Sequence, residues 1–600
     1  MNPRLLRVLF LCATLPAYAG GLPQPAPAPA GFDPLHESKD AYDARAQWFR
    51  DAKLGVFLHW TPSVNCGGEV SWIMKQDMGD MPRVPVEVYK ALPKIFDPKK
   101  FDPKAWVSLF EEAGMRYAVV VPKHHDGYAM WDTKVPGENV MNTPFRRDYI
   151  KAMAEACHGS KVQFCLYYSI LDWTSPKYNP AAGADLTAYK NEVFKPHMKE
   201  LLTHYGKVGC VWFDGHWDPA WTHENGKEMY AYMRRLQPGT LLGNRIDAKS
   251  NGSKVCAWTG SFFHGPDPVG DYQAREMDVG QFYMDKAWDN CYNLRANPCG
   301  SWSWIKDQYN WPVRTRDDVI GKLIECIGRD GGLLLGVGPR EDGTIDREDA
   351  FALRNIGLWM KENGEAVYGT RGGPWMPGPW GVSTRKGNKV YVFVQQLKDG
   401  KLSLPSLPAK VLSARMLQGA PVECADSDGL ITISIPRGRR NLVPAAIVEL
   451  TIDKNALELS PIPSTAVLNN LALGKPVEVS SVWPGRDTTN LKPAFITDGD
   501  ETTIWAAEES ARSATVTVDL GKESTLQKII FSDAPYRRTR AYDIEAMVGG
   551  KWQKLGEGTE TNFSGSAEIK VTDLKANKIR LNIRRATDTP VVAELQAIGK

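Results

Sequence analysis

Short apolar segments alternate with amphipathic segments between residues 38 and 370. The apolar segments have the length of strands and lie at 54–58, 117–121, 162–168, 208–213, 241–243 and 333–337. Between them, apolar residues recur with helical spacing at 103–113, 147–157, 187–204, 224–236 and 316–327. This alternation predicts an α/β domain at 38–370 whose parallel strands close into a (β/α)8-like barrel. Residues 257–311 are irregular, so the pattern does not show eight clean units.

The pattern changes after residue 370, where short alternating runs separated by Gly and Pro replace the helices. Runs such as 389–394 and 430–435 are typical of antiparallel strands. We therefore predict two all-β sandwich domains, at 371–456 and 470–600. A linker rich in Pro and Ser is expected between them, at 457–469.

The first 19 residues have the features of a secretory signal peptide. Two arginines precede a short apolar run, and the segment ends in Ala17-Tyr18-Ala19. A lipoprotein signal at Cys12 is less favoured, because the residue before that cysteine is the bulky Leu11. The Pro/Ala-rich residues 20–37 are expected to form an extended tether. The protein is therefore predicted to be secreted or periplasmic.

Charge and motif content exclude several classes of function. The chain has 73 basic and 70 acidic residues and no basic block, so nucleic acid is not an expected partner. No apolar stretch after the first twenty positions is long enough to span a membrane. No CxxC or HExxH motif is present, so the usual zinc signatures are absent.

Polar and aromatic residues follow five of the predicted strands, where a parallel barrel has its active site. They include His59, His124 with His125, Tyr167 with Tyr168, Asp214, and Arg245. Asp214 can be a nucleophile or the partner of an ion pair. The histidines can bind a metal or hydrogen-bond a polar substrate, but adjacent His124 and His125 would diverge on a strand, which disfavours a metal.

Tryptophans are concentrated at or just after the predicted strand ends, at Trp60, Trp131, Trp173, Trp212, Trp217 and Trp221. Core packing explains many of them, yet flat aromatic faces also suit the C–H faces of a sugar ring. Carboxylates and aromatic residues without a metal motif or a phosphate loop favour a glycosidase.

Several segments resemble the α-L-fucosidases of glycoside hydrolase family 29, in family order. They are WFRDAKLGVFLHW at 48–60, AGMRY at 113–117, KHHDGY at 123–128, LYYS at 166–169 with DW at 172–173, VWFDG at 211–215, GLLLGVGP at 332–339, and 356–370. The resemblance implies an exo-acting enzyme that retains anomeric configuration through a covalent glycosyl-enzyme.

The resemblance also implies roles for single residues. Asp214 matches the family nucleophile, and Trp212 matches a residue of the sugar pocket. His59, His124, His125, Tyr167 and Arg245 match positions that hydrogen-bond the fucose hydroxyls. Tyr168 is an alternative to Tyr167, because only one of two adjacent residues on a strand faces inward.

The acid/base residue is assigned to Glu276, which resembles the family's aromatic-x-x-x-Glu segment. Asp271, Asp278 and Glu224 are the alternatives. A retaining pair needs carboxyl groups about 5–5.5 Å apart, one of them with a raised pKa so that it can donate a proton.

Two segments depart from the family pattern, and both affect which sugar the protein is expected to accept. Glu69 and Trp72, which would fill the roles of an adjacent Glu-Trp pair, are separated by two residues. The segment 301–304 reads Ser-Trp-Ser-Trp, and one of its tryptophans, assigned to Trp304, is expected to pack on the C5 methyl group of fucose.

Residues 470–600 resemble F5/8 type C (discoidin-like) domains, which occur as carbohydrate-binding modules. The matching segments are NLALGKP at 470–476, TDGD at 497–500 with Trp505, VDLG at 518–521, and YDIE at 542–545 with Trp552. The resemblance implies an eight-stranded β-sandwich and a possible structural calcium ion.

Together these features predict a secreted retaining α-L-fucosidase that acts on fucosylated oligosaccharides or glycoconjugates and needs no cofactor for catalysis. The alternatives are a fucose-binding protein with impaired catalysis and a retaining glycosidase for a related sugar such as an α-L-galactoside. A metallohydrolase is a more distant alternative.

Overall fold

The computed structural model describes residues 22–599 except for 27, 78–81, 249–267, 278, 280–281, 297–301, 306–311, 398, 437, 439–441, 465–469, 484–490, 500–502, 534–537, 560 and 562–565. The expected signal peptide at 1–19 and the alternative acid Asp278 lie outside the described residues. Within the described part of the chain, no helix has the length and apolarity that crossing a membrane requires.

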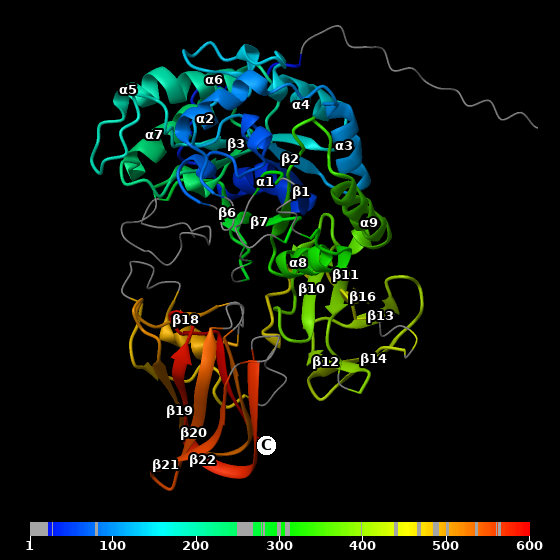
Figure 1. Ribbon diagram of the computed structural model, residues 1–600. Coiled ribbons are helices and arrows are strands. Elements are labelled where there is room, and N and C mark those ends of the chain that lie inside the picture. Colours follow the sequence, from blue (N-terminus) through cyan, green and yellow to red (C-terminus); the bar gives the residue numbers. More distant parts are fainter. Residues whose placement is uncertain are drawn as a thin grey trace, which may run out of the picture.

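The first domain is a parallel eight-stranded barrel surrounded by helices (Figure 1). Its strands are β1 (Leu54–Leu58), β2 (Tyr117–Val120), β3 (Gln163–Ser169), β4 (Cys210–Asp214), β5 (Leu241–Leu242), β6 (Tyr272–Glu276), β7 (Ala287–Asn293) and β8 (Gly332–Val337). The sheet order runs from β5 through β1 and β8 to β6, and a parallel bridge between Gly243 and Tyr272 links its two ends. The predicted barrel is thus confirmed, nearly closed.

Helices follow most of the strands and cover the outside of the barrel. They are α1 (Lys39–Ala52), α2 (Val86–Ala91), α3 (Pro103–Glu112), α4 (Tyr149–His158), α5 (Thr187–Tyr189), α6 (Lys195–Thr203), α7 (His223–Leu236), α8 (Arg316–Gly328) and α9 (Arg347–Asn363). Most begin with a side-chain cap; Asp102, for example, accepts hydrogen bonds from the N–H groups of Lys104 and Ala105 at the start of α3. Every residue of β1, β2 and β8 is buried, as expected for parallel strands covered on both faces.

Two antiparallel regions follow the barrel. The first has strands β9 (Arg371–Gly372), β10 (Gly381–Lys386), β11 (Lys389–Val394), β12 (Lys401–Pro405), β13 (Val411–Met416), β14 (Glu423–Ser427), β15 (Leu430–Ser434) and β16 (Ala446–Ile452), in sheets of five and three strands. Val382 of β10 packs closely on Gly328 at the end of α8, so this region is joined to the barrel.

The second region has strands β17 (Val477–Val479), β18 (Trp505–Ala506), β19 (Ala514–Ser532), β20 (Thr539–Val548), β21 (Lys551–Gly558), β22 (Ser566–Ala586), β23 (Val591–Val592) and β24 (Glu594–Gly599). Six of these strands form one sheet, and β18 pairs with β23. Its core, around Trp505, Phe531 and Leu581, is separate from the core of the barrel. Both regions confirm the predicted all-β architecture.

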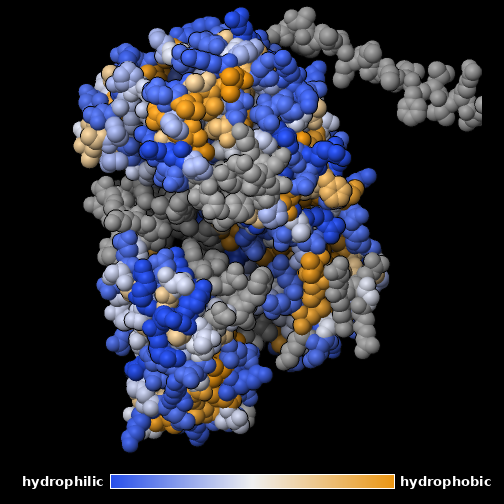
Figure 2. Space-filling view, viewed as in Figure 1, coloured by the Kyte–Doolittle hydropathy of each residue, from blue (hydrophilic) through white to orange (hydrophobic). Residues whose placement is uncertain are grey.

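The surface in Figure 2 is mainly hydrophilic, with apolar colour gathered over the part of the barrel that contains α2. Exposed apolar side chains in and after this helix are Val86, Val88 and Ile95.

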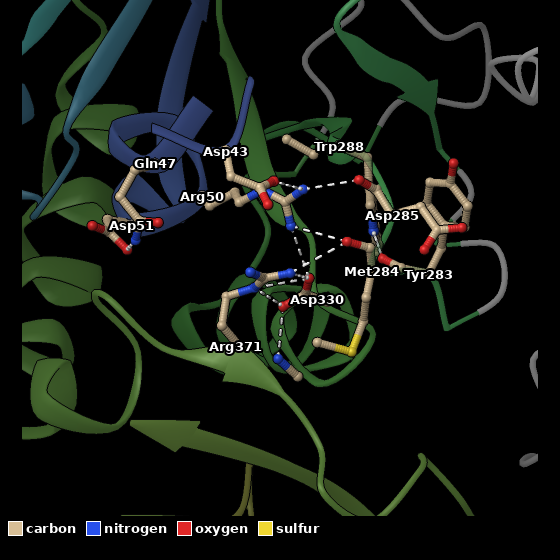
Figure 3. A network of polar contacts seen from close by, with 12 residues as sticks. Asp43, Gln47, Arg50, Asp51, Tyr283, Met284, Asp285, Trp288, Asp330 and Arg371 are labelled. Carbon is tan, nitrogen blue, oxygen red and sulfur yellow. Dashed lines mark hydrogen bonds and ion pairs between the residues drawn. The ribbon is translucent and has the colours of Figure 1, made fainter. Parts of the chain in front are cut away.

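A buried polar network joins the barrel to the first β domain (Figure 3). Asp330, which precedes β8 and has a φ of +73°, accepts hydrogen bonds from the Arg371 guanidinium at 2.6–3.0 Å and from the Gly372 N–H at 2.7 Å. Arg50 of α1 lies 3.5 Å from the same carboxylate and donates to the carbonyls of Met284 and Asp285. One buried carboxylate therefore ties together α1, the residues before β8 and strand β9.

Candidate active site

The predicted functional residues lie together at the carboxyl ends of the barrel strands. Asp214 and Glu276 are the last residues of β4 and β6, and His59 directly follows β1. Arg245 lies in the short helix that follows β5 (Asn244–Ile246). Parallel strands bring these positions, which are far apart in the sequence, to one edge of the sheet.

Arg245 connects the two carboxylates. Its Nη1 lies 3.2 Å from Asp214 Oδ1, its Nη2 lies 3.1 Å from Glu276 Oε2, and its Nε donates to the carbonyl of Ala274 at 3.1 Å. The guanidinium carbon also lies 4.4 Å from the ring centre of Trp212. Because one planar guanidinium contacts both carboxylates, it holds them within a few ångströms of each other.

The two carboxyl groups are largely removed from water, with 14% and 15% of their side chains exposed. Burial raises the pKa of Asp214, and the charge of Arg245 and the hydroxyl of Tyr167 oppose this rise. Burial also raises the pKa of Glu276; Arg245 lowers it, and the negative charge of Asp214 raises it further. Both pKa values are therefore raised, but Asp214 accepts a hydrogen bond from Tyr167 whereas the pKa of Glu276 is raised further by a neighbouring negative charge, so Glu276 is the better candidate for the proton that the pair carries.

Tyr167 and Tyr168 point to opposite sides of β3. The hydroxyl of Tyr167 donates to Asp214 Oδ2 at 3.0 Å, and its ring stacks on Trp212 inside the barrel. The hydroxyl of Tyr168 instead contacts His197 Nδ1 of α6 at 2.9 Å, in the helical layer. Of the two tyrosines, Tyr167 is therefore the one that can reach a bound sugar.

Three buried histidines line the same end of the barrel. Burial lowers the pKa of His59 to about 3 and lowers the pKa values of His124 and His125 well below the usual range, so all three are neutral. His125 Nδ1 lies 2.7 Å from Ser169 Oγ, and its Nε2 lies 3.6 Å from Asp214 Oδ2. Neutral imidazoles can both donate to and accept from sugar hydroxyls.

His124 and His125 do not diverge as the sequence predicts. Strand β2 ends at Val120, so both histidines lie in a loop where the alternation of a strand does not apply. Their ring centres are 4.1 Å apart, and together with Asp214 they offer ligand atoms within 4.8 Å of one another. The geometry of these three residues could therefore hold a metal ion, which the spacing argument disfavoured.

Glu69 and Trp72 contact different residues around the site. Glu69 Oε2 accepts from the backbone N–H groups of Trp302 and Ser303 at 2.7 and 3.1 Å, so it fixes that loop. Trp72 packs edge-to-face on His125, with ring centres 5.4 Å apart, and lies beside Trp173 and Trp217.

The structure brings Trp302, rather than Trp304, to the other pocket residues. The Trp302 ring centre lies 5.7 Å from that of His59, whereas Trp304 is buried under the Arg340 guanidinium. The spacing of the Ser-Trp-Ser-Trp segment does not distinguish its two tryptophans, because the loop is irregular.

The described alternatives for the acid do not join the site. Asp271 begins the turn before β6 and accepts from Arg45, Tyr230 and the N–H of Leu242, at the opposite end of the strand from Glu276. Glu224 is exposed in the first turn of α7.

Sequence reasoning missed Ser71 and Ser169, whose hydroxyl groups contact the Nδ1 atoms of His124 and His125. Ser169 directly follows the strand predicted at 162–168 and ends the observed β3, which is a usable signal. Ser71 follows no strand and has no such signal.

Comparison with known proteins identifies the family. A model of the alpha-L-fucosidase family matches residues 23–365, and a model of the F5/8 type C domain matches residues 476–595. Human tissue alpha-L-fucosidase is 27% identical over 445 residues, which cover 70% of this chain and 90% of that protein.

Solved structures agree with this assignment. Alpha-L-fucosidase isoenzyme 1 from Paenibacillus thiaminolyticus superposes with a TM-score of 0.58 at 28% identity, over 69% of this chain and all of that chain. The alpha-L-fucosidase from Vibrio sp. strain EJY3, at 20% identity, shares the fold over 94% of this chain and all of its own, with a TM-score of 0.65. These findings confirm the resemblance seen in the sequence: the chain is a glycoside hydrolase of the alpha-L-fucosidase family, with an F5/8 type C domain at residues 476–595.

Proposed function

We propose that this protein is a retaining α-L-fucosidase in which Asp214 is the nucleophile and Glu276 is the acid/base. The observation that carries the proposal is the pair of mostly buried carboxyl groups at the ends of β4 and β6, bridged by Arg245. A double displacement needs two carboxyl groups this close, one of them anionic and the other protonated.

In the first step, Asp214 attacks the anomeric carbon while Glu276 gives its proton to the glycosidic oxygen of the leaving group. A covalent glycosyl-enzyme forms, and the leaving group departs as an alcohol. In the second step, Glu276, now ionised, takes a proton from water, which displaces Asp214 and releases the sugar. Arg245 balances the charge as it moves from one carboxylate to the other.

Fucosylated oligosaccharides or glycoconjugates are the proposed substrates. His59, His124, His125 and Tyr167 would hydrogen-bond the sugar hydroxyls, and Trp212 supplies an apolar wall. Trp302, which lies beside His59, is a better placed partner for the C5 methyl group than Trp304. No cofactor takes part in this mechanism.

Hydrolysis of an aryl α-L-fucoside is expected to show a bell-shaped dependence of kcat/KM on pH. Activity should rise as Asp214 loses its proton and fall as Glu276 loses its own. Because both pKa values are raised, the apparent pKa of each limb of the pH profile should lie above the ordinary carboxyl values of about 3.9 and 4.3.

Glu276→Gln cannot titrate, so its residual activity should lack the alkaline limb. Initial rates between pH 3 and 9 measure both profiles. An alkaline limb that is unchanged in Glu276→Gln would assign the acid to another residue, and no turnover of α-L-fucosides by the wild type would favour a related sugar or a binding protein.

We further propose that the F5/8 type C domain binds a structural calcium ion near Asp498 and Glu594. Glu594 Oε1 accepts from the Gly499 N–H at 2.6 Å, and Asp498 Oδ2 accepts from Thr503 at 2.9 Å, so Glu594 contacts the residue next to Asp498. Carboxylate, hydroxyl and carbonyl oxygens are the ligands that Ca²⁺ takes. Bound calcium would stabilise the folded domain and would not take part in hydrolysis.

Calcium chloride is accordingly expected to raise the melting temperature of the domain above its value in EGTA, by mass action on the folded state. Glu594→Gln should abolish the difference, whereas the exposed control Glu478→Gln should keep it. Scanning calorimetry measures both. Equal melting temperatures in calcium and EGTA for the wild type would refute the calcium site.

We also propose that the protein is exported, because residues 1–19 have the features of a secretory signal peptide. Sequencing the amino terminus of protein secreted by an expressing cell should give Gly20 as the first residue.

A further inference from the structure

Ser71 lies in the segment that separates Glu69 from Trp72. Glu69 contacts the backbone N–H of Trp302 and Trp72 packs on His125, so the segment joins the 302–303 backbone to His125. Ser71 lies between Glu69 and Trp72 in the sequence, is fully buried, and hydrogen-bonds His124 Nδ1 through its hydroxyl.

The backbone of Ser71 is strained. Its φ of +55° and ψ of −42° lie where residues other than glycine are rarely found. Such a conformation persists only where the surroundings fix it, and it is concentrated at functional sites.

Tyr89 and Asp126 fix this conformation. The Ser71 N–H donates to the Tyr89 hydroxyl at 2.9 Å, and that hydroxyl donates to Asp126 Oδ2 at 2.6 Å. All three residues are buried. Asp126 lies two residues from His124 in the same loop. The hydrogen bonds that link His124, Ser71, Tyr89 and Asp126 therefore close a ring, which we call the circuit.

The circuit determines which atom of His124 is available. Because its Nδ1 is occupied by Ser71, Nε2 is the ring nitrogen left for a ligand, and rotation of the ring would break the Ser71 contact. The ring also stacks on Tyr167, with ring centres 5.2 Å apart and planes within 4°. His124 is thus held on one edge by Ser71 and on one face by the tyrosine that contacts Asp214.

We propose that Ser71 is a positioning residue of the active site: its hydroxyl orients His124 toward the sugar, and Tyr89 and Asp126 hold Ser71 in the strained conformation that this requires. The role of His124 as a sugar ligand rests on the proposed fucosidase function. The position of its ring does not.

Ser71→Gly removes the hydroxyl without adding backbone strain, because glycine accepts a positive φ and has no side chain. We expect kcat/KM for an aryl α-L-fucoside to fall by about 10- to 100-fold, mainly through a higher KM. Asp428→Gly is the matched control: Asp428 has a φ of +54° in an exposed turn between β14 and β15. It should keep full activity.

The melting temperature distinguishes positioning from a structural role. Ser71→Gly should lower it no more than Asp428→Gly does, despite its loss of activity. Full activity of Ser71→Gly, or a loss of activity matched by a large loss of stability, would overturn the proposal.

Tyr89→Phe tests the rest of the circuit. Alone it should reduce kcat/KM, and in the Ser71→Gly background it should cause no further loss, because Tyr89 would act through Ser71. Losses that multiply fully in the double variant would show that Tyr89 acts independently.

The ¹⁵N spectrum of histidine-labelled protein gives a readout that needs no turnover. The Nδ1 resonance of His124, assigned with His124→Gln, should shift in Ser71→Gly and stay unchanged in Asp428→Gly. If the wild type hydrolysed no fucoside, the fucosidase proposal would fail while this shift still decided the role of Ser71. An unchanged resonance would overturn that role and leave the fucosidase proposal standing.

Discussion

Asp214→Ala is expected to lower kcat for an aryl α-L-fucoside by more than about 10⁴-fold. The variant loses the carboxylate proposed to form the glycosyl-enzyme, and Arg245 and Tyr167 lose the group that they contact at 3.2 and 3.0 Å. Because the truncated side chain leaves space at the anomeric carbon, azide should enter and restore turnover. Its attack from the position of Asp214 gives a β-fucosyl azide, with inverted configuration.

Glu276→Ala is expected to behave differently. Its loss should be about 10²- to 10⁴-fold, the usual contribution of general acid–base catalysis, and smallest for aryl leaving groups that need little protonation. Asp214 can still form the glycosyl-enzyme, and azide then displaces Asp214 without help from a base. Two inversions give an α-fucosyl azide, so NMR of the azide product assigns the two carboxylates to different roles.

Glu224→Ala is the matched control, since it removes an exposed carboxylate from α7 and should leave kcat unchanged. The same α-azide from both variants would contradict the assignment of Asp214. Unimpaired activity of Glu276→Ala would retain the glycosidase and assign the acid to another residue.

The barrel could be predicted from the sequence where its strands are uniformly apolar, and two strands were missed where they are not. β6 and β7 carry the buried polar residues Gln273, Arg275, Asp289 and Asn290. Tyr117 donates to Asp289 Oδ2 at 2.9 Å inside the barrel, and Arg275 donates to Gln273 and lies over the ring of Trp288. A hydrophobicity pattern does not detect buried strands that carry several polar residues.

The residues of the candidate site likewise fall into those that the sequence could locate and those that it could not. Residues directly at strand ends, such as Asp214, could be located from the sequence because parallel strands end at one edge of the barrel, but strand geometry left Tyr167 and Tyr168 as alternatives. Residues in irregular loops could not: Trp302 rather than Trp304 lies beside His59, and Ser71 reaches His124 across 53 positions of sequence. Their positions depend on contacts such as that between Glu69 and the 302–303 backbone.

Asp330→Asn is expected to destabilise the barrel and the first β domain together, by about 3–5 kcal/mol. Asparagine keeps the size of the side chain and tolerates the positive φ, so the charge is what the variant removes. Asp330 is fully buried against Arg371, which donates at 2.6 Å, and against Arg50, at 3.5 Å. Arg371, whose side chain is 21% exposed, would lose this ion-pair partner, and buried Arg50 would be left with Asp43, at 3.6 Å.

The pH dependence of this effect follows from the pKa of Asp330, which the hydrogen bonds and charge of Arg371 hold below its usual value despite burial. A carboxyl group with a lowered pKa stabilises the folded protein above its unfolded pKa and loses that contribution as the pH falls. The gap between wild type and variant should therefore be full at pH 7 and shrink below about pH 4. Urea unfolding at several pH values measures it.

Asp428→Asn is the control, because this aspartate also has a positive φ but lies in an exposed turn; its change should stay within about 0.5 kcal/mol. Equal effects of the two variants would mean that the Asp330 charge contributes nothing.

Lys53 offers a reciprocal test of the same network. Its ammonium group is buried and has no hydrogen-bond partner among the residues that the structure describes. Burial lowers its pKa to about 8, and Asp330 provides the largest opposing charge. Removing that charge makes Lys53 a further unpaired cation, so Lys53→Met should recover part of the stability lost in Asp330→Asn. Methionine has a similar length and no charge to bury. If the double variant were less stable than Asp330→Asn, Lys53 would stabilise the protein through contacts other than its attraction to Asp330.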